Sequence, residues 1–209
     1  MGRIKNFRWI GVFVALILSG SISAQLYFDL SGQYNFFKHE EPLNIKNDQV
    51  GFALRIGITA YNSPNNKFKL SAELGSFSRT FYQEFPQEKF DYYFRGISLM
   101  PVATYKVRPW LGIDAGLSLA AYGSKIGKSI IDSEIGKGFR GYDIGLMIGS
   151  SHYFAEWFAI GARYTPYFVK MLSYKRIGDY GEFEQSKNDI STQNIEFYFR
   201  FEFLNSMQK

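Results

Sequence analysis

Eight segments of strict alternation between apolar and polar residues follow an N-terminal export signal, and the gaps between them are alternately long and short. A period of two is typical of a β-strand with one apolar and one polar face. Short turns at one end and long loops at the other indicate an all-β fold, an eight-stranded antiparallel up-and-down transmembrane β-barrel. Pro101, inside the fourth segment, cannot donate a ladder hydrogen bond and is expected to mark a bulge. The segments are residues 25–37, 49–61, 67–74, 93–106, 110–122, 139–152, 158–168 and 194–203.

The first 24 residues have the features of a cleavable signal peptide. A basic head that ends at Arg8 precedes an apolar core over residues 9–18, and small residues over 21–24 suit a signal peptidase. The apolar core is too short for a transmembrane helix, which needs about 20 residues. We expect cleavage after residue 24, or one residue earlier, to leave a single domain over residues 25–209.

Composition restricts the chemistry of the mature chain. Loss of the signal lowers the formal net charge from +5 to +2, so the basic pI of the whole chain does not indicate a nucleic-acid partner. The chain has no cysteine. This excludes disulfides, thiolate metal sites, cysteine nucleophiles and a lipid-modified N-terminal cysteine.

The distribution of charge predicts which face of the barrel meets lipid. The apolar faces carry almost no charge in their central spans, whereas the opposite faces carry balanced acids and bases. A soluble carrier would turn the apolar face inward, but a membrane barrel turns it outward. We therefore expect Leu54 and Leu146 to face lipid, and Ala53 and Gly145 to face the lumen. An ionic plug is expected inside, formed by Asp29, Arg55, Asp114, Asp143, Arg163, Glu196 and Arg200.

Two segments, residues 142–146 (YDIGL) and the closing 197–203 (FYFRFEF), carry a resemblance to a known family. The chain resembles the small outer-membrane β-barrels, in their OmpA/OmpX-like and PorT-like eight-stranded forms. The resemblance implies a multi-pass protein of the Gram-negative outer membrane with both termini periplasmic. It also implies contact with outer-membrane lipid and with the barrel-assembly machinery, because the last strand looks like an insertion signal. The chain departs from that signal in having six residues after Phe203 and no customary glycine.

The two histidines do not form a catalytic pattern. His39 lies in a charged segment that we expect to be a solvated loop, and His152 is followed by Tyr153 rather than by the His-x-Ser arrangement of barrel lipid hydrolases. The glycine-rich run over residues 136–138 lacks the spacing of a phosphate loop. No catalytic, cofactor or metal site is expected, and the protein is interpreted as non-enzymatic.

Four long loops are expected, over residues 38–48, 77–92, 123–138 and 170–189. The second is rich in aromatic residues, and it is interpreted either as an exposed surface for a protein partner or as a continuation of the strands on each side. We expect a structural or interaction protein that acts through its extracellular loops, with PorT-like protein secretion as the specific role that the resemblance suggests. A lipid-acting barrel enzyme and a small passive pore are the alternatives, although eight strands leave an interior that side chains fill. The candidate partner residues are Phe77, Arg79, Phe81, Tyr82, Phe85, Phe90 and Tyr92.

Overall fold

The computed structural model describes residues 25–39, 45–46, 50–84, 89–128, 141–169, 172–174 and 188–203, so the expected signal peptide lies outside the described residues. No helix among these residues is long and apolar enough to cross a membrane. The strands are β1 (Gln25–His39), β2 (Ile45–Lys46), β3 (Gly51–Asn62), β4 (Phe68–Glu84), β5 (Lys89–Arg108), β6 (Leu111–Lys128), β7 (Tyr142–Ala155), β8 (Phe158–Pro166), β9 (Leu172–Tyr174) and β10 (Asn188–Glu202).

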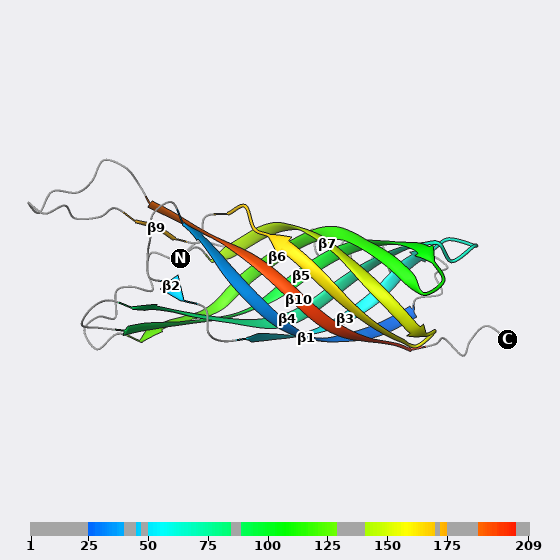
Figure 1. Cartoon of the computed structure of the whole chain (residues 1–209), viewed down its shortest axis with the longest axis horizontal. Coiled ribbons are helices and arrows are strands. Elements are labelled where there is room, and N and C mark those ends of the chain that lie inside the picture. The colour runs from blue at the N-terminus through cyan, green and yellow to red at the C-terminus, as the bar shows by residue number, and fades with distance from the viewer. Residues whose placement is uncertain are drawn as a thin grey trace, which may run out of the picture.

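Eight of these strands close into one barrel, as predicted (Figure 1). They follow one another around the wall in the order β1-β3-β4-β5-β6-β7-β8-β10, and β10 pairs with β1. Every pairing is antiparallel. The short strands β2 and β9 lie off the barrel, where β2 pairs with β4 and β9 pairs with β10. Closure satisfies the backbone of each barrel strand on both sides, which a sheet in hydrocarbon requires.

Three tight turns lie at one end of the barrel, which we call the turn end; the opposite end is the loop end (Figure 1). Between β3 and β4, Ser63 and Asn66 close a turn in which Asn66 has a φ of 54°. Asparagine tolerates this left-handed conformation. Only residues 109–110 separate β5 from β6, and only 156–157 separate β7 from β8. The barrel also begins and ends at the turn end, where Tyr27 pairs with Glu202.

The polarity of the barrel is inverted relative to a soluble protein. Leu54 and Leu146 are 45% and 52% exposed, whereas the neighbouring Ala53 is 3% exposed. Along β3 and β7 the exposure alternates residue by residue, with apolar side chains outward. Only a hydrocarbon surrounding makes this arrangement favourable, because water would oppose an exposed apolar wall. The chain is therefore a transmembrane β-barrel.

Several strands are longer than the sequence pattern predicted. β4 continues to Glu84, β5 begins at Lys89, and β6 continues to Lys128. Most of the loop expected over residues 77–92 is thus a β-hairpin, so the interpretation of these residues as continued strands is correct for the backbone. Phenylalanine and tyrosine favour extended structure, which explains why an aromatic-rich segment continues the sheet.

The bulge expected at Pro101 is not present. In the β5–β6 ladder, Leu99 pairs with Leu119 and Val102 pairs with Gly116, and no register shift falls between them. The shifts lie elsewhere, at Arg95/Gly96 and Lys106/Arg108. On its other side Pro101 stays paired with Ala72 of β4. The missing N–H of proline is therefore absorbed without adding a residue to the strand.

Candidate functional site

The barrel interior gathers the charged side chains that the alternation assigned to the lumen. All seven residues of the expected plug are at most 3% exposed. Glu73 of β4 joins them and is completely buried. With Glu73, these charges come from seven different strands, so the closed barrel, rather than any local segment, brings them together. The seven are Asp29, Arg55, Asp114, Asp143, Arg163, Glu196 and Arg200.

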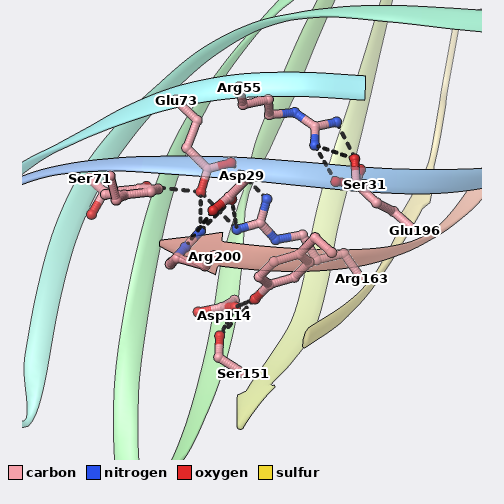
Figure 2. Close-up of polar contacts among 12 residues, drawn as sticks. Asp29, Ser31, Arg55, Ser71, Glu73, Asp114, Ser151, Arg163, Glu196 and Arg200 are labelled. Atoms are coloured by element: carbon pink, nitrogen blue, oxygen red, sulfur yellow. Dashed lines mark hydrogen bonds and ion pairs between the residues drawn. The ribbon is translucent and has the colours of Figure 1, made fainter. Parts of the chain in front are cut away.

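Two arginines and two carboxylates form the centre of this interior (Figure 2). Arg200 donates to both oxygens of Asp29 at 2.8 Å each, and to Glu73 at 2.6 Å. Arg163 donates to both oxygens of Glu73 at 2.7 Å each, and lies 3.5 Å from Asp29. Tyr27 donates its hydroxyl to Glu73 at 2.9 Å. Bidentate arginine–carboxylate pairs combine strength with a defined geometry. We call Asp29, Glu73, Arg163 and Arg200 the central cluster.

Two tyrosines hold the guanidinium groups of the central cluster. The Arg200 guanidinium lies 4.1 Å from the ring centre of Tyr27, and the Arg163 guanidinium lies 4.2 Å from that of Tyr198. Each tyrosine pairs across the ladder with a glycine, Gly57 for Tyr27 and Gly161 for Tyr198. A Cβ atom at either glycine would overlap the ring. The glycines thus leave the space in which the rings lie flat against the wall.

Asp114 is held by hydroxyl groups rather than by a direct ion pair. It accepts hydrogen bonds from Thr104 at 2.6 Å, Ser151 at 2.6 Å and Tyr198 at 2.8 Å. Three donors satisfy most of the acceptor capacity of one carboxylate. Because Tyr198 also lies against Arg163, the Asp114 group continues the polar network of the central cluster.

Arg55 and Glu196 form a separate pair nearer the loop end. Arg55 donates to both oxygens of Glu196, with Nη2 to Oε2 at 2.8 Å. Gln33 also donates to Glu196 at 3.1 Å. Both charges are buried and paired, which is the condition under which a buried ion pair is tolerated.

A third group lies in the lumen toward the loop end, and it includes Arg79, which the sequence analysis placed in an exposed loop. Arg79 is 2% exposed. Its guanidinium donates to the hydroxyl of Tyr122 at 2.6 Å and to the carboxylate of Asp143 at 3.4 Å. Its guanidinium lies 4.3 Å from the ring centre of Tyr167 and 4.7 Å from that of Phe77. The partner-surface prediction is therefore wrong for Phe77 and Arg79, which are buried. We call Arg79, Tyr122 and Asp143 the loop-end cluster.

The other candidate partner residues lie beyond this cluster. Phe81 and Tyr82 lie on β4, and Phe90 and Tyr92 lie on β5, in the hairpin that continues the wall. Their side chains are outside the described part of the structure, as is the whole of Phe85.

The neighbours of His152 differ from those of a hydrolase site. The His152 ring is exposed on the outer wall, 5.2 Å from the ring of Trp110 and 4.6 Å from that of Phe154. The adjacent Ser151 points into the lumen and bonds to Asp114. The backbone of His39 lies in β1, not in a loop, and its side chain is outside the described residues. Among the described residues, no group of three or more histidine or acidic side chains could hold a metal ion.

Comparison with known proteins finds similar solved structures but no matching sequence family. No family model and no curated protein sequence matches the chain. Among solved structures, it is similar to the attachment invasion locus protein Ail of Yersinia pestis, with 14% identity, 86% of this chain and 97% of that chain covered, and a TM-score of 0.43. It is also similar to the outer membrane protein AlkL, with 10% sequence identity and a TM-score of 0.48. That match covers 91% of this chain and 96% of AlkL. A third similar structure is that of the outer membrane enzyme PagL, with 14% sequence identity and a TM-score of 0.38. That match covers 83% of this chain and 98% of PagL.

At identities this low, the assignment of the chain rests on its own geometry. The wall is closed and antiparallel, its outer surface is apolar, and its interior is polar and paired. These are the properties of bacterial outer-membrane barrels. The chain is a small eight-stranded β-barrel of the outer-membrane type.

Proposed function

We propose that this protein is a non-conducting, non-enzymatic barrel of the outer membrane that acts as a structural or interaction protein through its loop end. The observation that carries the proposal is the length of three neighbouring strands. β4, β5 and β6 have 17, 20 and 18 residues, whereas about 9–11 residues suffice to cross a bilayer. Because these strands meet tight turns at the turn end, their extra length projects at the loop end (Figure 1).

The projecting sheet supports a role in recognition. Pairing between β5 and β6 continues out to Asp91 and Lys128, and β2 adds a short strand beside β4. A hydrogen-bonded sheet holds its side chains in place better than a free loop does, so little ordering entropy is lost when a partner binds. We propose that the partner is a protein that contacts this sheet, which includes the aromatic residues of the hairpin.

The interior supports the absence of conduction. The central cluster, the Arg55–Glu196 pair and the loop-end cluster lie one after another along the lumen. Breaking such paired charges to open a water path would cost several kcal/mol for each group, at roughly the scale of a lost buried ion pair.

Purified protein in planar bilayers is expected to show no steady conductance above background. Arg79→Ala should also stay closed, because it removes only the loop-end cluster and leaves the central cluster intact. A large and steady conductance of the wild-type protein would replace this proposal with the passive pore.

The chain also allows a test of orientation, because it contains no cysteine. We propose that the turn end and both termini face the periplasm, since short turns are periplasmic in barrels of this type. In intact cells, Ser124→Cys on the β6 projection should react with a membrane-impermeant maleimide, and Pro64→Cys in the β3–β4 turn should react only after lysis. The reverse pattern would contradict the orientation.

The same single cysteine serves to test the interaction itself. A photocrosslinker on Ser124→Cys should give a discrete adduct, and the same reagent on Pro64→Cys should give a different one or none. PorT-like secretion is the specific form of the proposal that the resemblance suggests. In that form, loss of the protein would retain secreted cargo in the periplasm, whereas a purely structural protein would leave secretion unchanged.

The enzymatic alternative has less support from the geometry. A barrel hydrolase needs serine, histidine and an acid on the same side of the wall. Here His152 lies on the outside while Ser151 and Asp114 lie inside. Purified protein is therefore expected to leave lipid substrates intact.

A further inference from the structure

Between the Arg55–Glu196 pair and the loop-end cluster, the inner wall carries a set of small or uncharged side chains. β10 shows the order of these layers, because its inward row runs from Glu196 through Asn194 to Thr192. Thr192 donates to Asp143 of the loop-end cluster at 3.0 Å. We call the intermediate set the neutral layer, and all of its members are buried. They are Gln33, Asn35, Ala53, Ser98, Ala120, Gly145 and Asn194.

Three amide side chains of the neutral layer lie together on neighbouring strands. Asn35 of β1 and Asn194 of β10 are direct ladder partners, and Gln33 lies one inward position from Asn35. Side chains directly opposite each other in an antiparallel ladder have Cβ atoms about 4.5–5.5 Å apart. Gln33 also pairs with Gly51 of β3, where a Cβ atom would lie 3.5 Å from Nδ2 of Asn35. The three amides therefore form one patch of the inner wall over β3, β1 and β10.

Several polar atoms of this patch are buried without a hydrogen-bond partner among the described residues. They are Nδ2 and Oδ1 of Asn35, Oδ1 of Asn194 and Oε1 of Gln33. Oγ of Ser98, which pairs with Ala120 across the β5–β6 ladder, is a further one. Exchanging the oxygen and nitrogen of the Asn35 amide would change nothing, because both are unpaired. Buried polar groups normally have a partner, so these atoms together indicate a ligand that both donates and accepts hydrogen bonds.

We propose that the neutral layer is an internal binding site for water. Buried water molecules make about two to four hydrogen bonds each, to polar groups that would otherwise be unpaired. Amide oxygens accept and an amide N–H donates, so the patch offers both kinds of partner. An ion fits less well, because the layer has no charged side chain. Glu196 beside it already accepts from Arg55 and Gln33.

The bound water is expected to exchange with solvent through the loop end. Toward the turn end lie the Arg55–Glu196 pair and the central cluster, in which arginines donate to both oxygens of a carboxylate. Toward the loop end lies the loop-end cluster, in which Arg79 reaches Asp143 through one contact of 3.4 Å. A long, single contact is weaker than a bidentate pair and opens more easily. The site is thus a hydrated segment above a dry plug, which is compatible with a barrel that does not conduct and does not depend on a partner at the loop end.

The test of the site uses the mature wild-type chain in lipid nanodiscs and measures magnetisation transfer from water to side-chain N–H protons by NMR. The Nδ2 protons of Asn35 should show direct cross-relaxation with water, which its sign separates from proton exchange. The control is the Nε–H of Arg200, which is also buried but donates to Asp29 at 2.8 Å, and it should show none. Absence of cross-relaxation at Asn35 overturns the proposal. Equal cross-relaxation at Arg200 also overturns it, because the lumen would then be wet throughout.

Two variants test the route by which water enters. Arg79→Gln should speed exchange of the Asn35 amide protons with solvent by about tenfold or more, because the ion pair that covers the layer is lost. Lys69→Gln is the matched control, since it removes a buried cation paired with Glu202 at the turn end, and it should leave the rate unchanged. Equal acceleration by Lys69→Gln, or none by Arg79→Gln, would overturn the loop-end route. Heat-dependent gel mobility confirms folding, and Tyr122→Phe, which removes a hydroxyl bonded to Arg79, takes the place of Arg79→Gln if that variant fails to fold.

Discussion

Replacing Arg163 with alanine is expected to destabilise the folded barrel by about 3–5 kcal/mol, because it leaves buried carboxylate charge without its partner. Arg163 makes both of its hydrogen bonds to Glu73, at 2.7 Å, and is 2% exposed. After its loss, Glu73 and Asp29 would share Arg200 alone. The measurement is unfolding by urea in lipid vesicles. Its signal is the fluorescence of Trp110 and Trp157, the tryptophans that remain after the signal is cleaved.

Two further variants separate the loss of a pair from general damage. Arg108→Ala removes an exposed arginine and should change the free energy of unfolding by less than about 0.5 kcal/mol. Arg163→Met combined with Glu73→Gln removes both charges, so it should cost less than the sum of the single changes. An Arg163→Ala variant as stable as wild type would show that the central cluster contributes nothing to the barrel.

Placing a lysine on the outer wall at mid-barrel is expected to cost about 2–4 kcal/mol, because hydrocarbon cannot solvate the charge. Leu54→Lys and Leu146→Lys make this change at two positions that are 45% and 52% exposed. Both variants should fold into vesicles less completely than wild type and unfold at lower urea. The matched control is Val107→Lys at the turn end, where the interface is close and the cost should fall to about 0–1 kcal/mol.

In lipid, the free-energy cost of an outward-facing lysine depends on its depth in the membrane, and this dependence distinguishes lipid from other surroundings. Val107 is 47% exposed, nearly the same as Leu54. If exposure to water were the relevant property, all three lysines would be tolerated equally. Equal and small effects at the three positions would therefore contradict the assignment of the outer wall to lipid.

The alternation of the sequence was sufficient to predict which side of the wall each central residue faces. Period two does not depend on tertiary structure, so Asp29 and Arg55 could be assigned to the lumen from the sequence alone. Tyr27 lies two residues before Asp29 and therefore on the same face of β1. The alternation predicts its inward position, although the sequence analysis did not single it out.

The partners of the buried charges could not be predicted in this way. Asp29 is the direct ladder neighbour of both Arg55 and Arg200, and it bonds to Arg200. Arg163 is the ladder neighbour of Glu196, but it bonds across the lumen to Glu73. Contacts across the lumen depend on the stagger of the strands around the closed barrel, which no single segment encodes.

The inward position of Arg79 in the loop-end cluster was missed for a different reason, although Asp143 of the same cluster was assigned to the lumen. Lys69 and Glu73 face inward on β4. If the same alternation is continued along the strand, Phe77 and Arg79 also face inward, as they do in the structure. The aromatic residues on both faces of this segment hid the alternation and led to the prediction of an exposed loop. The ends of strands are hard to predict from alternation, because fewer residues on either side define the period.

The most direct test of an inverted membrane barrel is the behaviour of the mature wild-type chain, residues 25–209, with and without lipid. It should fold only in vesicles or detergent, and the unboiled protein should migrate differently from the boiled protein on a gel. A closed barrel that is apolar outside and ionic inside requires this result. A mature chain that stays soluble and folded in water without detergent would contradict the transmembrane assignment.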